Sequence, residues 1–366
     1  MTVGEVCAAV DAIAPPALAY SWDKVGLAIG SPDANIRAVL VALGINPNAV
    51  RAAKRAKANL IVSHHPVIWE PLNALRTDDP HTAMCLDLAQ SNIACYSAHT
   101  NLDVVPGGVN TVLADRIGLT NTTPLFSVAQ SDQVKLVTFV PEQHLHNVRS
   151  AICAAGAGVI GEYTDCSFRT PGVGTFRPGR ASTPFSGKKN QINEEPEIKL
   201  EVLVLKAKLP TALRALVETH PYEEPAYDVL TLENRDTSYS LGLRADLTRT
   251  ATLDGFASHV RTSLDVTHVR VTGNGKRKVK HVAVMGGSGG GQIADLPDDV
   301  DVFVTGDVKY HEAELAALRG IALIDAGHAG TEKWIVPALA TYLRKQVKGM
   351  TVRAYVEPDY FRSITK

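Results

Sequence analysis

Short apolar runs alternate with segments of helical periodicity in the first third of the chain, and this alternation limits the possible folds more than any other feature. Strands are expected at 38–43, 60–63 and 93–97, and helices at 3–13, 48–57, 81–90 and 109–117. Strands that alternate with helices of about ten residues are typical of βαβ units, in which neighbouring strands run parallel. The first third is therefore predicted to form a largely parallel sheet with flanking helices.

The same alternation returns in the last third of the chain. Strands are expected at 281–285, 301–305, 322–325 and 352–356, and helices around Ile293 and at 311–318 and 331–345. Both ends of the chain thus predict α/β structure with mixed, largely parallel sheets.

The middle of the chain has a different order of elements. Strands are expected at 134–140, 198–207 and 226–232, helices at 143–155 and 210–219, and a loop-like stretch rich in Gly, Pro and Ser at 172–191. These three strands and two helices supply all but one strand of the β-α-β-β-α-β order of a ferredoxin-like α+β sandwich, and we interpret the stretch as that fold. It predicts an inserted domain at 126–236 that splits the core domain into a first half, 1–125, and a second half, 237–366, since surface loops tolerate such insertions.

The bulk composition is that of a soluble globular protein. The 366 residues are 45% hydrophobic, with 37 Lys and Arg against 38 Asp and Glu, so charge gives no argument for a nucleic-acid or membrane partner. The apolar N-terminus lacks a basic n-region, and no run approaches the roughly 20 apolar residues of a membrane span. Five cysteines without a C-x-x-C pair indicate reduced thiols and a cytoplasmic location.

Two adjacent histidines, His64 and His65, follow the strand expected at 60–63. This position matters because ligand sites in open α/β sheets lie beyond the carboxyl ends of the strands. Histidine or carboxylate side chains also follow three other expected strands, namely His99 and Asp103, Asp307 and His311, and Asp325, His328 and Glu332. We therefore expect four strand ends to direct these groups toward one edge of the sheet.

Imidazole and carboxylate groups in this number favour a metal centre with two ions. The nitrogens of His64, His65 and His328 and the carboxylates of Asp103 and Glu332 provide five donors. One catalytic zinc keeps three protein ligands and an open position, so five donors are too many for it. Two ions about 3.5–4 Å apart can share a carboxylate and a bridging water. A donor set without thiolate suits zinc first, and iron or manganese next.

Two roles are possible for the other four side chains, which are those of His99, Asp307, His311 and Asp325. They can cap a helix or hold a metal ligand through a hydrogen bond, or they can contact substrate and transfer protons. We expect His99 and His311 to be catalytic proton-transfer residues, and Asp325 to orient a metal ligand.

The glycine-rich run 285–292 follows a strand and precedes an expected helix. Free amides at a helix N-terminus bind phosphate, so the run is a candidate phosphate site. It lacks the Gly-Lys-Ser/Thr of a Walker A loop, and no nicotinamide cofactor is expected. The alternative is a tight turn that lets the backbone approach the metal site. Sequence alone leaves both alternatives open.

Several of these segments resemble the NIF-three-like family, whose bacterial members are often labelled GTP cyclohydrolase 1 type 2 homologues. The matching segments in the core are 21–27, 63–66, 99–103, 107–110, 305–307 with 310–311, and 325–328 with Glu332. The segment 220–228 marks the long form of the family, in which the insert resembles a PII- or CutA-like fold.

The resemblance implies a dinuclear metal site at the same five donors and a toroidal homohexamer with the metal sites facing an inner cavity. It leaves two functions open. The first is a metal-dependent hydrolase that acts on a nucleotide or a phosphorylated small molecule through a metal-activated water. The second is a non-catalytic regulatory or scaffold protein that binds metal and senses a metabolite or partner through the insert.

Overall fold

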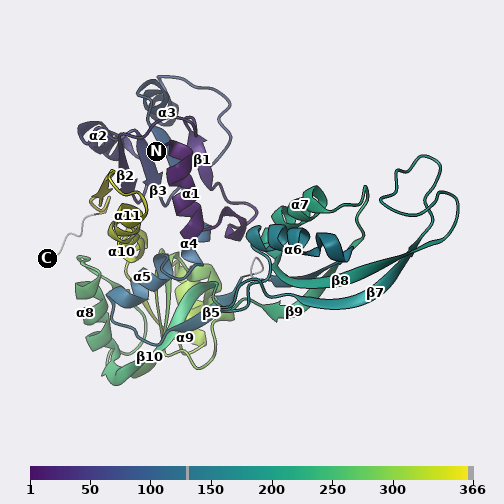
Figure 1. The fold of residues 1–366 in the computed structure, drawn as a ribbon. Coiled ribbons are helices and arrows are strands. Elements are labelled where there is room, and N and C mark those ends of the chain that lie inside the picture. The colour runs from purple at the N-terminus through teal and green to yellow at the C-terminus, as the bar shows by residue number, and fades with distance from the viewer. Residues whose placement is uncertain (129–131, 362–366) are drawn as a thin grey trace. The chain divides into compact units, whose positions relative to one another are not determined.

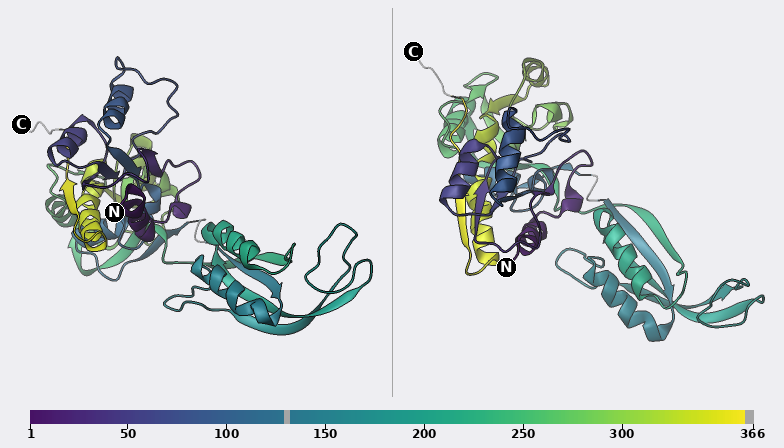
Figure 2. Two further views of the ribbon diagram at one scale, coloured as in Figure 1. Left: turned by 45° about the horizontal axis from the view of Figure 1, so that its top comes forward. Right: turned by 90° about the horizontal axis from the view of Figure 1, so that it is seen from above.

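A computed structural model describes residues 1–128 and 132–361 and divides the chain into two compact units (Figures 1 and 2). One unit joins the segment Met1–Ser127 to the segment that begins at Ser238, and the chain between them forms the other. In the part of the chain that is described, no helix has the length and apolar character needed to cross a membrane.

The first unit contains a five-stranded sheet in the order β1-β4-β3-β2-β15. Its strands are β1 (Gly26–Ile29), β2 (Ala38–Ala42), β3 (Leu60–Ser63), β4 (Ala94–Ser97) and β15 (Thr351–Tyr355). All neighbours are parallel except β1, which is antiparallel to β4. Every residue of β2, β3 and β4 is buried, as expected for parallel strands that are covered on both faces.

Four helices accompany this sheet: α1 (Val3–Ile13), α2 (Pro47–Arg55), α3 (Pro80–Gln90) and α11 (Ile335–Gln346). Apolar side chains of α2 and α3 share one core cluster with side chains of β2, β3 and β4. Helix α11 contacts β2, β15 and α1.

The same unit contains a six-stranded sheet in the order β11-β14-β13-β12-β10-β5. Its strands are β5 (Thr123–Ser127), β10 (Ser240–Thr252), β11 (Arg270–Val271), β12 (Lys278–Ser288), β13 (Val302–Gly306) and β14 (Ala322–Asp325). Strands β12, β13 and β14 are parallel, whereas β5, β10 and β11 pair antiparallel with their neighbours. The helices α5 (Val109–Arg116) and α8 (Leu253–Ser263) contribute to one core cluster, and η5 (Gly290–Asp295) and α9 (Tyr310–Leu318) to another.

The observed α/β class, with mixed, partly parallel sheets and flanking helices, agrees with the class predicted from the sequence. One helix was predicted wrongly: instead of one helix at 331–345, the chain forms α10 (His328–Glu332) and then α11. Pro337 explains the break, because proline has no N–H to donate to the carbonyl of Lys333 and is tolerated only in the first turn of a helix. Trp334 occupies the junction, and its indole N–H donates to the carbonyl of Leu264 at 3.1 Å.

The second unit is a four-stranded antiparallel sheet in the order β7-β8-β6-β9 with two helices. The elements are β6 (Asp132–Val140), α6 (Leu145–Ala154), β7 (Phe168–Phe176), β8 (Asn193–Leu205), α7 (Leu209–Thr219) and β9 (Tyr227–Arg235). Alternate apolar residues of β6 and β8 form the core with residues of α6 and α7, which lie on one face of the sheet (Figure 1).

The loop-like stretch predicted at 172–191 is partly a strand, because β7 extends to Phe176. Pro171 and two glycines lower the strand propensity of this segment, but β7 is an edge strand, where a missing backbone N–H is tolerated.

Candidate metal centre

Strand ends from both sheets of the first unit come together at one group of polar side chains. His64 and His65 follow β3, while His328 and Glu332 lie on α10, which follows β14. Asp103 ends α4 (Thr100–Asp103), the short helix after β4. The expectation that these groups share one edge of one sheet was wrong, because β3 and β4 belong to the five-stranded sheet and β14 belongs to the six-stranded sheet.

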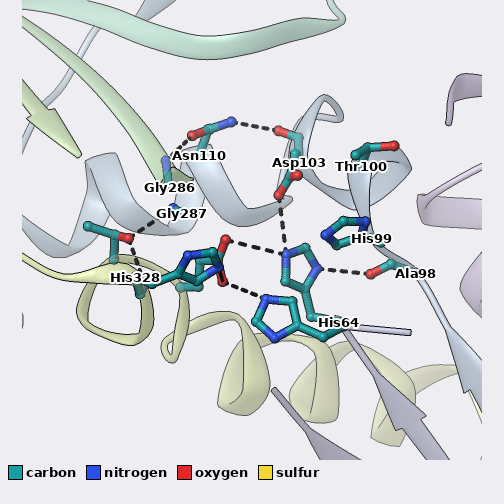
Figure 3. Close-up of polar contacts among 12 residues, drawn as sticks. His64, Ala98, His99, Thr100, Asp103, Asn110, Gly286, Gly287 and His328 are labelled. Atoms are coloured by element: carbon teal, nitrogen blue, oxygen red, sulfur yellow. Dashed lines mark hydrogen bonds and ion pairs between the residues drawn. The ribbon is translucent and has the colours of Figure 1, made fainter. Parts of the chain in front are cut away.

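All five side chains predicted as metal ligands are brought close together. Figure 3 labels three of them, His64, Asp103 and His328. Oε2 of Glu332 lies 2.9 Å from Nε2 of His65 and 3.1 Å from Nε2 of His328. Nε2 of His64 lies 3.5 Å from Oδ1 of Asp103 and 3.7 Å from Oε1 of Glu332. Two groups of three donors therefore share Glu332: one contains His65 and His328, and the other contains His64 and Asp103.

His64 shows most clearly that this group suits a cation. Its side chain is only 1% exposed, and its Nδ1 lies 2.9 Å from the carbonyl oxygen of Ala98. A carbonyl can only accept, so Nδ1 donates its proton to Ala98, and Nε2 is the nitrogen whose lone pair could bind a cation beside Asp103 and Glu332. Among the described residues Nε2 has no hydrogen-bond partner, which is costly for a buried polar atom. A metal ion would satisfy this lone pair and both carboxylates.

The electrostatics of the group are also those of a cation site. Burial raises the pKa of Asp103, and the neighbouring charge of Glu332 raises it further. Burial also opposes ionisation of Glu332, but hydrogen bonds, first of all from His328, hold the pKa of its carboxyl well below the usual value. The hydrogen bond to Glu332 in turn raises the pKa of His328 to about 9. Two buried carboxylates in one place need compensating positive charge.

The glycine-rich run 285–292, which begins in the last residues of β12 and continues into η5, lets the backbone approach these ligands. Gly287 has φ of +67°, and a Cβ there would collide with the carboxylate of Glu332. A Cβ on Gly286 would lie 2.7 Å from Cγ1 of Val109. Both positions therefore require glycine for close packing against α5 and α10.

The amides of this turn are already used within the protein. Side-chain oxygens accept the N–H groups of Gly286, Gly287 and Gly289 at distances of 2.9, 2.9 and 3.0 Å. The acceptors are Asn110, Thr331 and Thr305. These contacts favour the close-approach alternative over phosphate binding at these three amides.

His99 lies beside the group and is held by a carboxylate that sequence reasoning did not identify. Its Nδ1 lies 2.8 Å from Oδ1 of Asp23, and the other oxygen of Asp23 accepts the backbone N–H of Thr100 at 3.0 Å. Burial opposes the ionisation of Asp23, but the hydrogen bonds from His99 and Thr100 lower its pKa to about 2. Asp23 is therefore ionised, and it directs Nε2 of His99 away from itself. The available signal was the position of Asp23 in the segment 21–27, which matches the family.

The remaining candidates lie at different distances from the group. Asp307, with φ of +54°, places its carboxylate 2.7 Å from Nδ1 of His328 and so orients that ring. Asp325 accepts the backbone N–H of Gly327 at 2.9 Å and holds the turn before α10. His311 is different, because its side chain is 89% exposed and pairs with Glu314 on α9 at 3.4 Å. In the described residues, no hydrogen bond, ion pair or ring contact joins His311 to the five donors.

A family model described as Duf34/NIF3 (NGG1p interacting factor 3) matches residues 1–359. The chain belongs to the Duf34/NIF3 family. This confirms the resemblance that the sequence motifs indicated.

Curated relatives of this NIF3 family member cover most of its length. A protein of Halalkalibacterium halodurans named GTP cyclohydrolase 1 type 2 homolog is 38% identical over 91% of this chain and 90% of its own. A protein of the same name from Bacillus subtilis is 37% identical over 86% of this chain and 84% of its own. A crystal structure of a Bacillus cereus protein related to NIF3 is similar with a TM-score of 0.84 and 36% identity, over 100% of this chain and 99% of that one.

Proposed function

We propose that this NIF3-family protein is a metal-dependent hydrolase with two divalent ions, acting on a nucleotide or a phosphorylated small molecule. The buried Nε2 of His64 carries the proposal, because it faces Asp103 and Glu332 without a hydrogen-bond partner among the described residues. The names of the curated relatives point to the same class of reaction, since a cyclohydrolase opens a ring with water.

The two groups of three donors suggest how the ions would be held. His64, Asp103 and Glu332 would bind one ion, and His65, His328 and Glu332 the other. Imidazole with carboxylate suits zinc first, and iron or manganese next. When bound, such ions act as Lewis acids and lower the pKa of water, which makes hydroxide available near neutral pH.

The residues around the donors would position ligands and move protons. Asp307 keeps the ring of His328 in place through Nδ1, as outer carboxylates do for metal-bound histidines. Asp23 keeps the proton on Nδ1 of His99, so Nε2 is the atom that exchanges a proton with substrate. We assign this step to His99 and not to His311, whose exposed ring pairs with Glu314.

The test is metal content together with activity. Protein purified without chelator is expected to hold about two transition-metal ions per chain by elemental analysis and to hydrolyse at least one member of a nucleotide panel. Glu332→Ala, which removes the shared donor, should lose both ions and activity, while His65→Ala should retain about one. His311→Ala is the matched control and should keep the metal. Full metal content and full activity in Glu332→Ala would refute the two-ion site.

A second candidate function is metabolite sensing by the second unit, which contains a cavity of about 940 Å³. Aromatic and charged side chains line it, among them Phe139, Phe185, Tyr222, Arg177 and Lys199. Tyr222 donates to Glu197 at 2.7 Å on the cavity wall. This function predicts a metabolite that raises the melting temperature of chelator-treated protein, with the effect lost in Tyr222→Ala and no turnover.

The organisation that we propose for the chain follows the family. The sheet of the second unit has the strand order β7-β8-β6-β9, which supports a ferredoxin-like insert at 126–236. The core halves would then be 1–125 and 237–366. We further propose a cytoplasmic, toroidal homohexamer. Light scattering of the purified protein tests the assembly, since a monomer in solution would refute it.

A further inference from the structure

Two of the three tryptophans, Trp22 and Trp69, are exposed, whereas the third, Trp334, is packed against the protein. Trp334 is partly buried and donates its indole N–H to Leu264, and the guanidinium of Arg116 lies 3.7 Å above its ring. Trp22 and Trp69 are instead 53% and 44% exposed. Within residues 1–128 and 132–361, neither donates its indole N–H to a protein acceptor. Aromatic surface this exposed is typical of a binding site.

Tyr20, Trp22 and Trp69 form one continuous aromatic surface, which we call the aromatic wall. The rings of Tyr20 and Trp22 are stacked, with centroids 5.6 Å apart and planes inclined by 8°. The centroids of Trp22 and Trp69 are 5.9 Å apart. The backbone N–H of Tyr20 donates to Oγ1 of Thr100 at 3.1 Å, which ties the wall to the same segment as His99.

The aromatic wall leads directly to the candidate metal ligands. The ring of Trp69 meets His99 edge to face, with centroids 5.6 Å apart and an interplanar angle of 89°. His99 in turn lies 5.1 Å from His64 and 5.8 Å from His65 between ring centroids. A flat group stacked on the wall would therefore have its edge toward His99 and the donors.

We propose that the aromatic wall binds the planar ring of an aromatic heterocycle, such as a purine, and that this ring belongs to the substrate of the metal centre. The assignment of this ring to the substrate rests on the proposed hydrolase function, whereas binding of the ring to the aromatic wall does not. Recognition through the ring also agrees with the glycine-rich turn, where the amides of Gly286, Gly287 and Gly289 are occupied by side chains and not free for phosphate. Stacking on aromatic side chains is sequence-tolerant and strong enough to hold a base.

The experiment uses full-length protein treated with chelator, so that binding of the ring is measured without metal. Guanosine offers the ring without phosphate, and ribose 5-phosphate offers phosphate without the ring. Guanosine is expected to quench tryptophan fluorescence saturably and to bind in equilibrium dialysis, while ribose 5-phosphate does neither. Trp22→Leu and Trp69→Leu should each weaken guanosine binding about tenfold, and Trp22→Phe should restore part of the loss.

Controls separate stacking from other effects. Tyr310→Leu removes a ring that is 76% exposed on α9 and should leave guanosine affinity unchanged. Thermal melts establish that each variant folds, and if a leucine variant does not, Trp69→Phe and Trp22→Phe are titrated instead, with a several-fold loss expected. Equal guanosine affinity in wild type and folded wall variants would overturn the proposal. So would a wall variant that dissociates into smaller oligomers with unchanged guanosine affinity, since the wall would then be a subunit contact.

Metal content of the same proteins distinguishes the two proposals. Trp22→Leu should keep its metal, because it removes no donor. If guanosine binds through the wall but no loading condition gives a bound transition metal, the hydrolase is refuted and the ring site stands. If metal binds and guanosine does not, the ring site is refuted and the hydrolase stands.

Discussion

Gly287→Ala tests whether the glycine-rich turn exists to admit the carboxylate of Glu332. Gly287 has φ of +67°, and a Cβ there would meet Oε1 of Glu332. The left-handed conformation alone costs an alanine about 1–2 kcal/mol. The collision adds a second cost, because Glu332 must leave its hydrogen bonds with His65 at 2.9 Å and His328 at 3.1 Å. A hydrogen bond to a charged group contributes about 1.5–3 kcal/mol. If one such bond is lost, Gly287→Ala lowers the free energy of unfolding by roughly 2.5–5 kcal/mol in all.

Gly320→Ala is the matched control for this prediction. Gly320 has φ of +70°, and a Cβ there would have no atom within 4 Å, so only the conformational cost applies. Urea unfolding of both variants in the presence of chelator measures the free energy of unfolding, and elemental analysis measures metal content without chelator. We expect Gly287→Ala to be less stable than Gly320→Ala by about 1.5–3 kcal/mol and to lose metal, while Gly320→Ala keeps it. Equal stability and equal metal content would refute the steric argument.

Three further predictions concern other parts of the first unit. Asp23→Asn should lower kcat about 10- to 100-fold in a steady-state assay with metal content unchanged, because it frees the ring of His99 to rotate; an unchanged kcat would contradict this role. Chelator should lower the melting temperature of wild-type protein but not of Glu332→Ala, since a metal that binds only the folded state stabilises it; equal shifts would contradict the site. Asp301→Asn tests the pH dependence of stability. Burial opposes ionisation of Asp301, but the backbone N–H groups of His281 and Lys280 lower the pKa of its carboxyl. The stabilisation from Asp301 is therefore present above the unfolded pKa of about 3.9 and is lost as the pH falls through the lower folded pKa. Wild type should therefore lose more unfolding free energy than the variant between pH 6 and pH 3 in urea titrations, and parallel curves would argue against it.

The elements that sequence predicted best are those whose signal is local. Helix α1 begins with a capping box, in which Thr2 accepts the N–H of Glu5 and Glu5 accepts the N–H of Thr2, and the predicted range equals the observed one. Strand β3 is four consecutive buried residues before two histidines, and its range is also the predicted one. In both segments the chain itself contains the start and end signals.

The elements that were missed depend on partners far away in the sequence. Strand β10 was not predicted, although Leu241, Leu243, Ala245 and Leu247 alternate with other residues over its first half. It is formed between β5 and β12, and its pairing of Ser240 with Ser127 joins residues that the whole second unit separates. Local periodicity indicates that such a strand can form, but it does not indicate which strand it pairs with.

The candidate site was more accessible to sequence reasoning than the sheets that build it. The carboxyl end of a parallel strand is a functional position whichever sheet the strand joins, so the five donors could be chosen without knowing that there are two sheets. What could not be chosen was the set of partners, because Asp23 and Asp307 act through contacts with His99 and His328 that only the folded chain creates.

The division of donors between two sheets has a consequence for folding. His64, His65 and Asp103 precede the second unit in sequence, whereas His328 and Glu332 follow it, so the two halves of the core meet at this group. Before the halves pack, both Asp103 and His64 lack Glu332 as a neighbour, and the like charges of Asp103 and Glu332 then resist the final approach. One group of three donors, His64, His65 and His99, lies within the first half, whereas the other two combine Glu332 with residues of the first half. A cation held by either of these two groups would offset the repulsion only when both halves are in place. Metal binding and the joining of the two halves are therefore one coupled equilibrium, in which the free energy of binding stabilises the assembled core.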